Sequence, residues 1–164
     1  MELNQALDKL KQSKDFKDMN KDTFFSYALI MQENNQTGKW QLGFYNKSTD
    51  KMITFVVDNN GIKTEKEEEI FKKPETQVNE VDLKKAKIAY IEILKKAEEF
   101  QKKEYPKELV SKTIAILQNL EEFGTIWNIT YVTLTFNTLN MKINPENGKI
   151  VNHKLESLMS FAKE

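Results

Sequence analysis

The chain contains no cysteine and no arginine, and it has a single histidine, His153. Without cysteine there is no disulfide, no thiolate metal ligand and no cysteine nucleophile. Without arginine, every basic side chain is a lysine, which offers a point charge rather than the planar fork that grips phosphate or guanine through two bonds. This lysine-rich chain carries 25 basic and 25 acidic residues, so its formal net charge is zero, which argues against nucleic acid as a partner.

Catalytic and metal-binding signatures are also scarce. Only five glycines are present, and no Gly-x-Gly-x-x-Gly or Gly-Lys-Ser/Thr motif occurs, so no phosphate-binding loop is expected. The acidic run at 65–69 indicates a solvated surface, and His153 stands between Asn152 and Lys154, where a surface position is expected. Because no set of nucleophile, base and acid is visible, we expect no enzyme activity, no metal and no cofactor.

Long apolar runs are missing as well. No stretch approaches the 18 or so apolar residues that a membrane-spanning helix needs. The first four residues lack the basic start and apolar run of a signal peptide, so the sequence as it stands predicts a cytoplasmic protein. An extracytoplasmic location follows instead if an export signal has been removed.

The composition that remains is that of a folded protein. With 164 residues, 39% hydrophobic and 10% aromatic, the chain is expected to form one domain or two small ones around a substantial core. A polar segment at 75–81 is a candidate linker, and it would divide the chain into units at 1–74 and 82–164.

The first unit predicts a helix followed by four antiparallel strands. Leu3, Ala6, Leu7 and Leu10 have helical spacing, which predicts a helix over 2–14, and a polar connection follows at 15–22. Strands are expected at 23–32, 40–45, 52–57 and 62–66. The segment 23–32 is apolar on both faces, so a buried helix is its alternative. Residues 58–61, Asp-Asn-Asn-Gly, predict a tight turn with positive φ rather than a calcium loop.

The second unit predicts two long helices followed by three strands. An apolar stripe from Leu83 to Phe100 predicts a helix over 82–103, and apolar residues behind Pro106 predict a second helix over 107–122. Strands are expected at 127–131, 139–143 and 150–151, with a turn at 144–148. Residues 154–161 extend the last strand or form a terminal helix, and their spacing favours the helix.

The stretches after Trp40 and Trp127 resemble each other, since both predict strand, turn, strand, Asx/Gly turn and strand. The expected fold class is therefore α+β, with two helix-plus-antiparallel-meander halves packed closely. The first half would have one extra strand and the second one extra helix. The two long central helices would cover the apolar faces of both meanders.

Residues 127–151 resemble the PepSY module. Their pattern is Trp-x-Ile-x-Tyr, a gap, and Leu-x-Met-x-Ile-Asn-Pro-Glu-Asn-Gly-Lys-Ile-Val, with Asn144 where the family usually has aspartate. Residues 39–66 look like a degenerate copy, with Asp58 at the aspartate position. The resemblance implies a small, often tandem, helix-plus-sheet unit that is not catalytic. Such units are associated with peptidase propeptides and cell-envelope proteins and are thought to bind or inhibit other proteins.

Four aromatic residues are the candidate binding surface: Trp40, Tyr45, Trp127 and Tyr131. Packing in the core is the ordinary role of a tryptophan. The functional interpretation is that an aromatic residue of each copy faces a groove and anchors a peptide or another subunit. By strand alternation Tyr131 shares the face of Trp127, whereas Tyr45 lies on the opposite face from Trp40.

These observations predict a non-enzymatic protein- or peptide-binding or regulatory module. It would work by pairing at a sheet edge or through a groove between helix and sheet. The alternative is a cystatin-like α+β domain that holds a small apolar ligand between its helices and its sheet.

Overall fold

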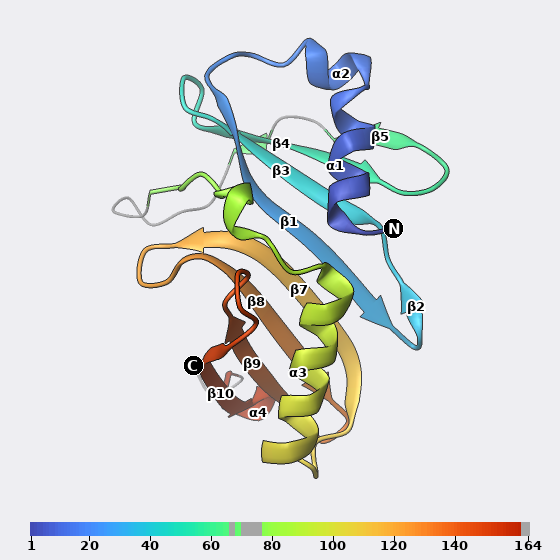
Figure 1. The fold of residues 1–164 in the computed structure, drawn as a ribbon, viewed down its shortest axis with the longest axis vertical. Coiled ribbons are helices and arrows are strands. Elements are labelled where there is room, and N and C mark those ends of the chain that lie inside the picture. The colour runs from blue at the N-terminus through green and yellow to red at the C-terminus, as the bar shows by residue number, and fades with distance from the viewer. Residues whose placement is uncertain (66–67, 70–76, 162–164) are drawn as a thin grey trace.

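A single twisted antiparallel sheet runs through both halves of the chain (Figure 1). The computed structural model describes residues 1–65, 68–69 and 77–161. The strands of the first half are β1 (Thr23–Glu33), β2 (Gln36–Thr37), β3 (Trp40–Asn46), β4 (Lys51–Val57), β5 (Ile62–Thr64) and β6 (Glu68–Glu69). Those of the second half are β7 (Val110–Leu120), β8 (Gly124–Thr133), β9 (Asn137–Ile143) and β10 (Ile150–Ser157). The order across the sheet is β10-β9-β8-β7-β1-β3-β4-β5, with β2 beside β1 and β6 beside β4.

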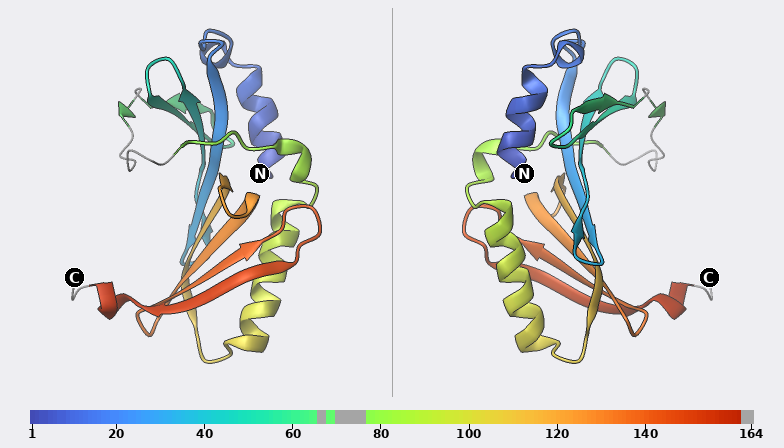
Figure 2. Two further views of the ribbon diagram at one scale, coloured as in Figure 1. Left: turned by 90° about the vertical axis from the view of Figure 1, so that its left-hand side faces the viewer. Right: turned by 90° about the vertical axis from the view of Figure 1, so that its right-hand side faces the viewer.

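The two longer helices cover one face of this sheet, and of the described helices only the short α4 (Leu158–Phe161) lies toward the other side (Figure 2). The longer helices are α1 (Leu3–Lys11) and α3 (Tyr90–Glu104); the other short helices are α2 (Lys14–Lys17) and η1 (Leu83–Lys85). The apolar stripe of α1 is buried as predicted. The α+β class and the antiparallel sheet are confirmed, and both halves share one sheet. Among the described residues, no helix has the length and apolar character needed to cross a bilayer.

The two halves meet where β1 pairs with β7. Ala28 of β1 lies opposite Leu117, and Ile30 lies opposite Ala115. On the far side of each strand the same relationship recurs, because Ala28 pairs with Leu42 and Ala115 pairs with Ile129. Ala28 and Ala115 are thus equivalent, as are Leu42 and Ile129, and the separation along the chain is the same in both cases. Trp40 and Trp127 stand two residues before Leu42 and Ile129, so they occupy equivalent places about a local two-fold axis.

The predicted helix at 107–122 is wrong, because this segment forms β7. It is a central strand with neighbours on both sides, and both of its faces carry apolar residues. Ala115 and Leu117 face the core, while Ile114 and Ile116 lie half-buried on the other face. A run that is apolar on both faces matches helical and strand periodicity equally well. The second long helix expected in the second half is therefore absent. In the described part of the chain, each half has one longer helix, α1 or α3, and contributes four strands to the main path of the sheet.

Two further helix predictions need correction. The helix expected over 82–103 begins only at Tyr90, because the N–H groups of Lys87 and Ile88 donate to the carbonyl of Pro145 at 3.2 and 3.1 Å. Asp82 caps only the short turn η1. The terminal helix expected over 154–161 is confined to α4, because β10 stays paired with β9 as far as Ser157.

The turns also differ in part from expectation. Residues 58–61 have no positive φ; instead the Asp58 carboxylate accepts from the N–H groups of Asn60 and Gly61 at 2.8 and 2.9 Å. Positive φ occurs at Asn34 and Asn35, where β1 turns into β2. The connection at 15–22 contains the short helix α2.

Several predictions fall partly or wholly outside the described residues. They are the start of the linker at 75–81, the unit boundary at 74, Lys66 at the end of the expected strand 62–66, and part of the acidic run at 65–69. Within the described part, Val81 is buried and donates its N–H to the carbonyl of Phe25 at 2.9 Å. The end of the linker therefore packs on β1.

Candidate functional site

The two tryptophans of the predicted binding surface lie in the core. Trp40 and Trp127 are each 1% exposed, and their ring centroids are 6.4 Å apart. Tyr90, at the start of α3, packs against both, at 5.1 Å from Trp40 and 5.4 Å from Trp127. The N–H of Tyr90 donates to the Glu2 carboxylate at 2.9 Å, which ties α3 to the residue preceding α1. This cluster joins the two halves.

The two indole nitrogens differ in their partners. Trp40 Nε1 donates to the carbonyl of Met1 at 3.0 Å. Trp127 Nε1 is buried and has no partner among the described residues. Buried polar groups without partners are rare and costly, so the two equivalent positions differ in energy.

The two tyrosines lie on opposite faces of the sheet, as predicted. Tyr45 packs edge-on against Phe24 at 5.4 Å on the face away from α1 and α3, and its hydroxyl donates to Asp50. It lines a small pocket of about 380 Å³ beside residues 77–80. Tyr131 lies on the other face beside α3. The four aromatic residues therefore do not form one surface.

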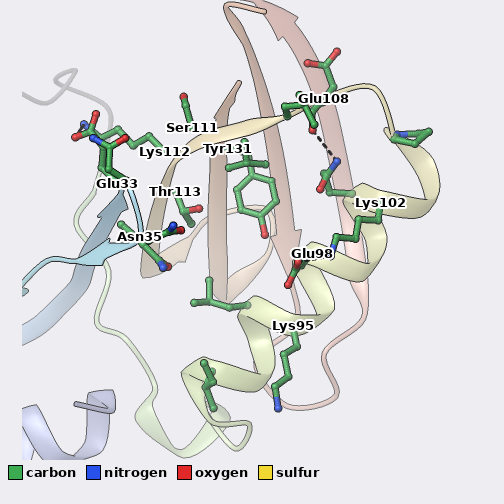
Figure 3. Close-up of a pocket in the computed structure, with 18 residues that line it drawn as sticks. Glu33, Asn35, Lys95, Glu98, Lys102, Glu108, Ser111, Lys112, Thr113 and Tyr131 are labelled. Atoms are coloured by element: carbon green, nitrogen blue, oxygen red, sulfur yellow. Dashed lines mark hydrogen bonds and ion pairs between the residues drawn. The ribbon is translucent and has the colours of Figure 1, made fainter. Parts of the chain in front are cut away.

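Tyr131 instead lines a larger groove between α3 and the first residues of β7 (Figure 3). The groove has a volume of about 640 Å³ and is open to solvent. Its walls come from α3, from the connection to β7, and from the end of β1 with its turn. Its lining includes Glu33, Ile91, Glu98, Leu109, Val110 and Tyr131.

The groove mixes apolar and charged side chains. Leu109 is 62% exposed and Ile91 49%, which is unusual for large apolar residues that face a concave surface. Charges of both signs flank them: Lys102 pairs with Glu98 at 2.5 Å, and Lys112 lies 4.0 Å from Glu33. A groove with this lining can hold a segment that carries both apolar side chains and polar backbone groups.

The floor of the groove carries a neutral tyrosine. Figure 3 shows the hydroxyl of Tyr131 directed toward Glu98. Burial raises the pKa of Tyr131 well above its usual value, and the charge of Glu98 raises it further. The phenol hydroxyl is a hydrogen-bond donor at the wall of the groove.

One side of β7 is unpaired where it borders the groove. The pairing of β1 with β7 ends at Glu33 and Lys112, because the chain turns back at Asn34. Val110 therefore pairs only with Thr133 of β8, Ser111 is the extra residue of a bulge between Val110 and Lys112, and both lie beyond the end of β1. The connection before them is held by Gln101, which is buried and donates to the carbonyls of Tyr105 and Glu108, each at 2.9 Å.

The remaining sequence candidates are His153 and the acidic run at 65–69, part of which lies outside the described residues. Within 1–65, 68–69 and 77–161, no group of three His, Asp or Glu side chains is placed to hold a metal ion. His153 lies on β10 and is exposed, as expected of a surface residue. Its Nδ1 is 2.5 Å from the hydroxyl of Tyr105, and its ring packs edge-on against Phe100 at 4.9 Å.

Sequence reasoning missed most of the groove. Leu109 and Val110 fall within the incorrectly predicted helix 107–122, and the sequence does not indicate where β1 ends relative to β7. The one local signal was the pair Asn34-Asn35, whose residue type tolerates positive φ and so predicts that the strand stops there.

Comparison with known proteins supports the fold alone. No family model matches the chain, and no curated protein matches it. The chain is similar in structure to a crystal structure described as a putative lipoprotein from Clostridium difficile 630, with a TM-score of 0.56 and 14% sequence identity. The similarity covers 87% of this chain and 88% of the clostridial chain, so it spans both halves.

Proposed function

We propose that the protein is a non-enzymatic binding module of two PepSY-like halves that holds an extended segment of a protein or peptide in the groove between α3 and β7. The groove itself is the observation that carries this proposal. It combines an open shape, exposed Leu109 and Ile91, and a strand that has no pairing with β1 at Val110 and Ser111. An extended peptide uses all three, because it offers backbone hydrogen bonds and alternate side chains at once.

The same features favour a peptide over a small apolar ligand. A pocket for a small apolar molecule buries most of the ligand surface and is lined mainly by apolar groups. This groove is open and carries Glu33, Glu98, Lys102 and Lys112 along its walls. A peptide tolerates such a lining, since its own polar groups can face the charges.

An extracytoplasmic location is part of the proposal. The clostridial protein of similar fold is described as a putative lipoprotein, and the PepSY resemblance implies an envelope role. A protein at that location would meet extended segments of other exported or membrane-anchored proteins.

A displayed library of random dodecapeptides, selected against the whole chain, tests the proposal. We expect selected peptides, resynthesised, to protect the amide of Val110 from hydrogen exchange. Replacing Ile91→Asp should weaken their binding by about tenfold or more, since it places a charge against the apolar part of the groove.

Val151→Asp is the matched control, because Val151 is 48% exposed, close to the 49% of Ile91, and does not line the groove. The Val151→Asp variant should bind the same peptides with the affinity of the unaltered protein. If no peptide is selected, or if both variants bind equally well, the groove is not a peptide site.

A further inference from the structure

The strand β10 forms one outer edge of the sheet and is open along its length (Figures 1 and 2). It has eight residues, Ile150–Ser157, and pairs with β9 on one side, while no described strand pairs with its other side. The opposite edge, β5, has three residues. A long unpaired edge is a template for another strand, and proteins normally protect it.

The backbone of β10 directs its unpaired groups outward at alternate residues. Leu158 donates its N–H to the carbonyl of Phe136 at 2.8 Å. The preceding pair, Ser157 and Asn137, is therefore a non-hydrogen-bonded pair of the β9–β10 ladder. Antiparallel bonding alternates along a strand, so residues 152, 154 and 156 bond to β9. His153, Leu155 and Ser157 then point their N–H and C=O groups away from the sheet. The Ser157 carbonyl also accepts from the Ser160 hydroxyl at 2.6 Å.

The side chains of the same edge are self-complementary. Lys154 and Glu156 lie on either side of Leu155 and form an ion pair with each other on the face away from α1 and α3. Leu155 points to the helix side and is 37% exposed. If two copies of β10 run antiparallel with Leu155 at the centre, Lys154 of each copy lies opposite Glu156 of the other.

We infer that β10 is a self-pairing edge and that its partner is a second copy of this chain. In this register Leu155 pairs with Leu155, and His153 pairs with Ser157, so the outward N–H of each residue faces the outward C=O of its partner residue. Lys154 and Glu156 form two cross-strand ion pairs at the non-hydrogen-bonded positions, where facing side chains lie closest. The bulge between Ile150 and Asn152 limits the pairing to the remainder of the strand. The result is a symmetric dimer with a continuous sheet.

Charge reversal at this edge tests the pairing by sedimentation equilibrium of the whole chain over concentrations up to millimolar. We expect the unaltered protein to be a dimer at the upper end of this range. Lys154→Glu and Glu156→Lys should each weaken dimerisation by about tenfold or more, because each replaces two attractive pairs with two repulsive ones. The double variant Lys154→Glu/Glu156→Lys should dimerise as the unaltered protein does.

An equimolar mixture of the two single variants adds a sharper test. One strand is then acidic at both positions and the other basic, so we expect a heterodimer from proteins that do not dimerise alone. Lys63→Glu, the same change on the opposite edge strand β5, should leave dimerisation unchanged. Circular dichroism shows whether each variant remains folded, which is expected since both side chains are at the surface.

Three results would overturn the inference. They are a protein that stays monomeric at every concentration, a dimer that resists both single reversals, and single variants that fail to associate when mixed. A monomer whose Leu155 amide gains protection only on addition of a foreign extended peptide would assign the edge to that peptide and would also overturn self-pairing.

Discussion

The ring centroids of Trp40 and Trp127 lie 6.4 Å apart at equivalent positions of the two halves, yet their indole nitrogens differ in hydrogen bonding. Trp40 donates to the carbonyl of Met1, whereas Trp127 is buried without a partner among the described residues. Each ring packs against Tyr90, so the two share a hydrophobic environment. Comparing substitutions at the two positions therefore measures how much the hydrogen bond from Trp40 to Met1 contributes to the free energy of unfolding.

Replacement of each tryptophan by phenylalanine should therefore have unequal effects. Both changes leave a similar small cavity, but Trp40→Phe also removes a hydrogen bond, whereas Trp127→Phe removes an unsatisfied buried donor. We expect Trp40→Phe to lower the free energy of unfolding by about 1 kcal/mol more than Trp127→Phe does. Urea denaturation measures both values, and equal losses would show that the Met1 contact contributes nothing.

A second prediction concerns Gly43 on β3, over which the ring of Tyr27 lies. A Cβ added at Gly43 would stand 2.0 Å from the nearest atom of that ring. The Tyr27 hydroxyl is hydrogen-bonded to Thr54 Oγ1 at 3.0 Å, so moving the ring breaks a contact. Gly43→Ala should destabilise the fold by about 1–3 kcal/mol through overpacking.

The matched test is Gly43→Ala made together with Tyr27→Ala. Once the ring is absent, the added methyl group has room, and its additional effect should fall below about 0.5 kcal/mol. A full effect in the absence of the ring would place the strain in the backbone of β3.

Phe136 provides a third prediction, at the tip of the β8–β9 hairpin. It has φ of 59° and is 67% exposed, so its side chain gains little from packing while its backbone is strained. Phe136→Gly should raise stability by about 0.5–1 kcal/mol, because glycine adopts positive φ without strain. Leu134→Gly is the control: Leu134 is 63% exposed and has no positive φ, so glycine there should destabilise. Thermal unfolding separates the two outcomes by their sign.

The fourth prediction is an acid dependence that arises at Glu108. Partial burial opposes its ionisation, but hydrogen bonds from Thr135, Thr133 and Asn137 outweigh burial and hold its pKa below the usual 4.5. Because the pKa is lower in the folded state, the stabilisation is present above pH 4.5 and is lost as the pH falls through the folded value. The carboxylate ties the hairpin tip to the start of β7.

Glu108→Gln should remove this part of the acid dependence. At neutral pH we expect a loss of about 1 kcal/mol, and the difference between the two proteins should narrow as the pH falls below 4.5. Urea denaturation at a series of pH values measures the difference. A gap that stays constant with pH would mean that the charge of Glu108 is not involved.

Strands β3, β4 and β9 and helix α1 could be predicted from the sequence because their apolar patterns are local. Trp40, Leu42 and Phe44 alternate along β3, and the four apolar residues of α1 define one helical stripe. In both cases the period of the pattern and the buried face agree. Each pattern therefore had one interpretation.

β7 and the groove could not be predicted in the same way. Ile114 and Ile116 lie half-buried on the face away from α1 and α3, and only the pairing with β1 and β8 makes a strand of them. The groove depends on where β1 stops relative to β7, which is a register between segments far apart in the chain. No local periodicity encodes that register.

The antiparallel ladder between β1 and β7 has a consequence for how the two halves relate. Either half made alone would expose one long edge of β1 or β7, and an exposed strand edge tends to pair with another strand. The local two-fold axis between Ala28 and Ala115 is the arrangement that two identical single modules would adopt as a dimer. The full chain is thus the covalent equivalent of such a pair, and each half completes the sheet of the other.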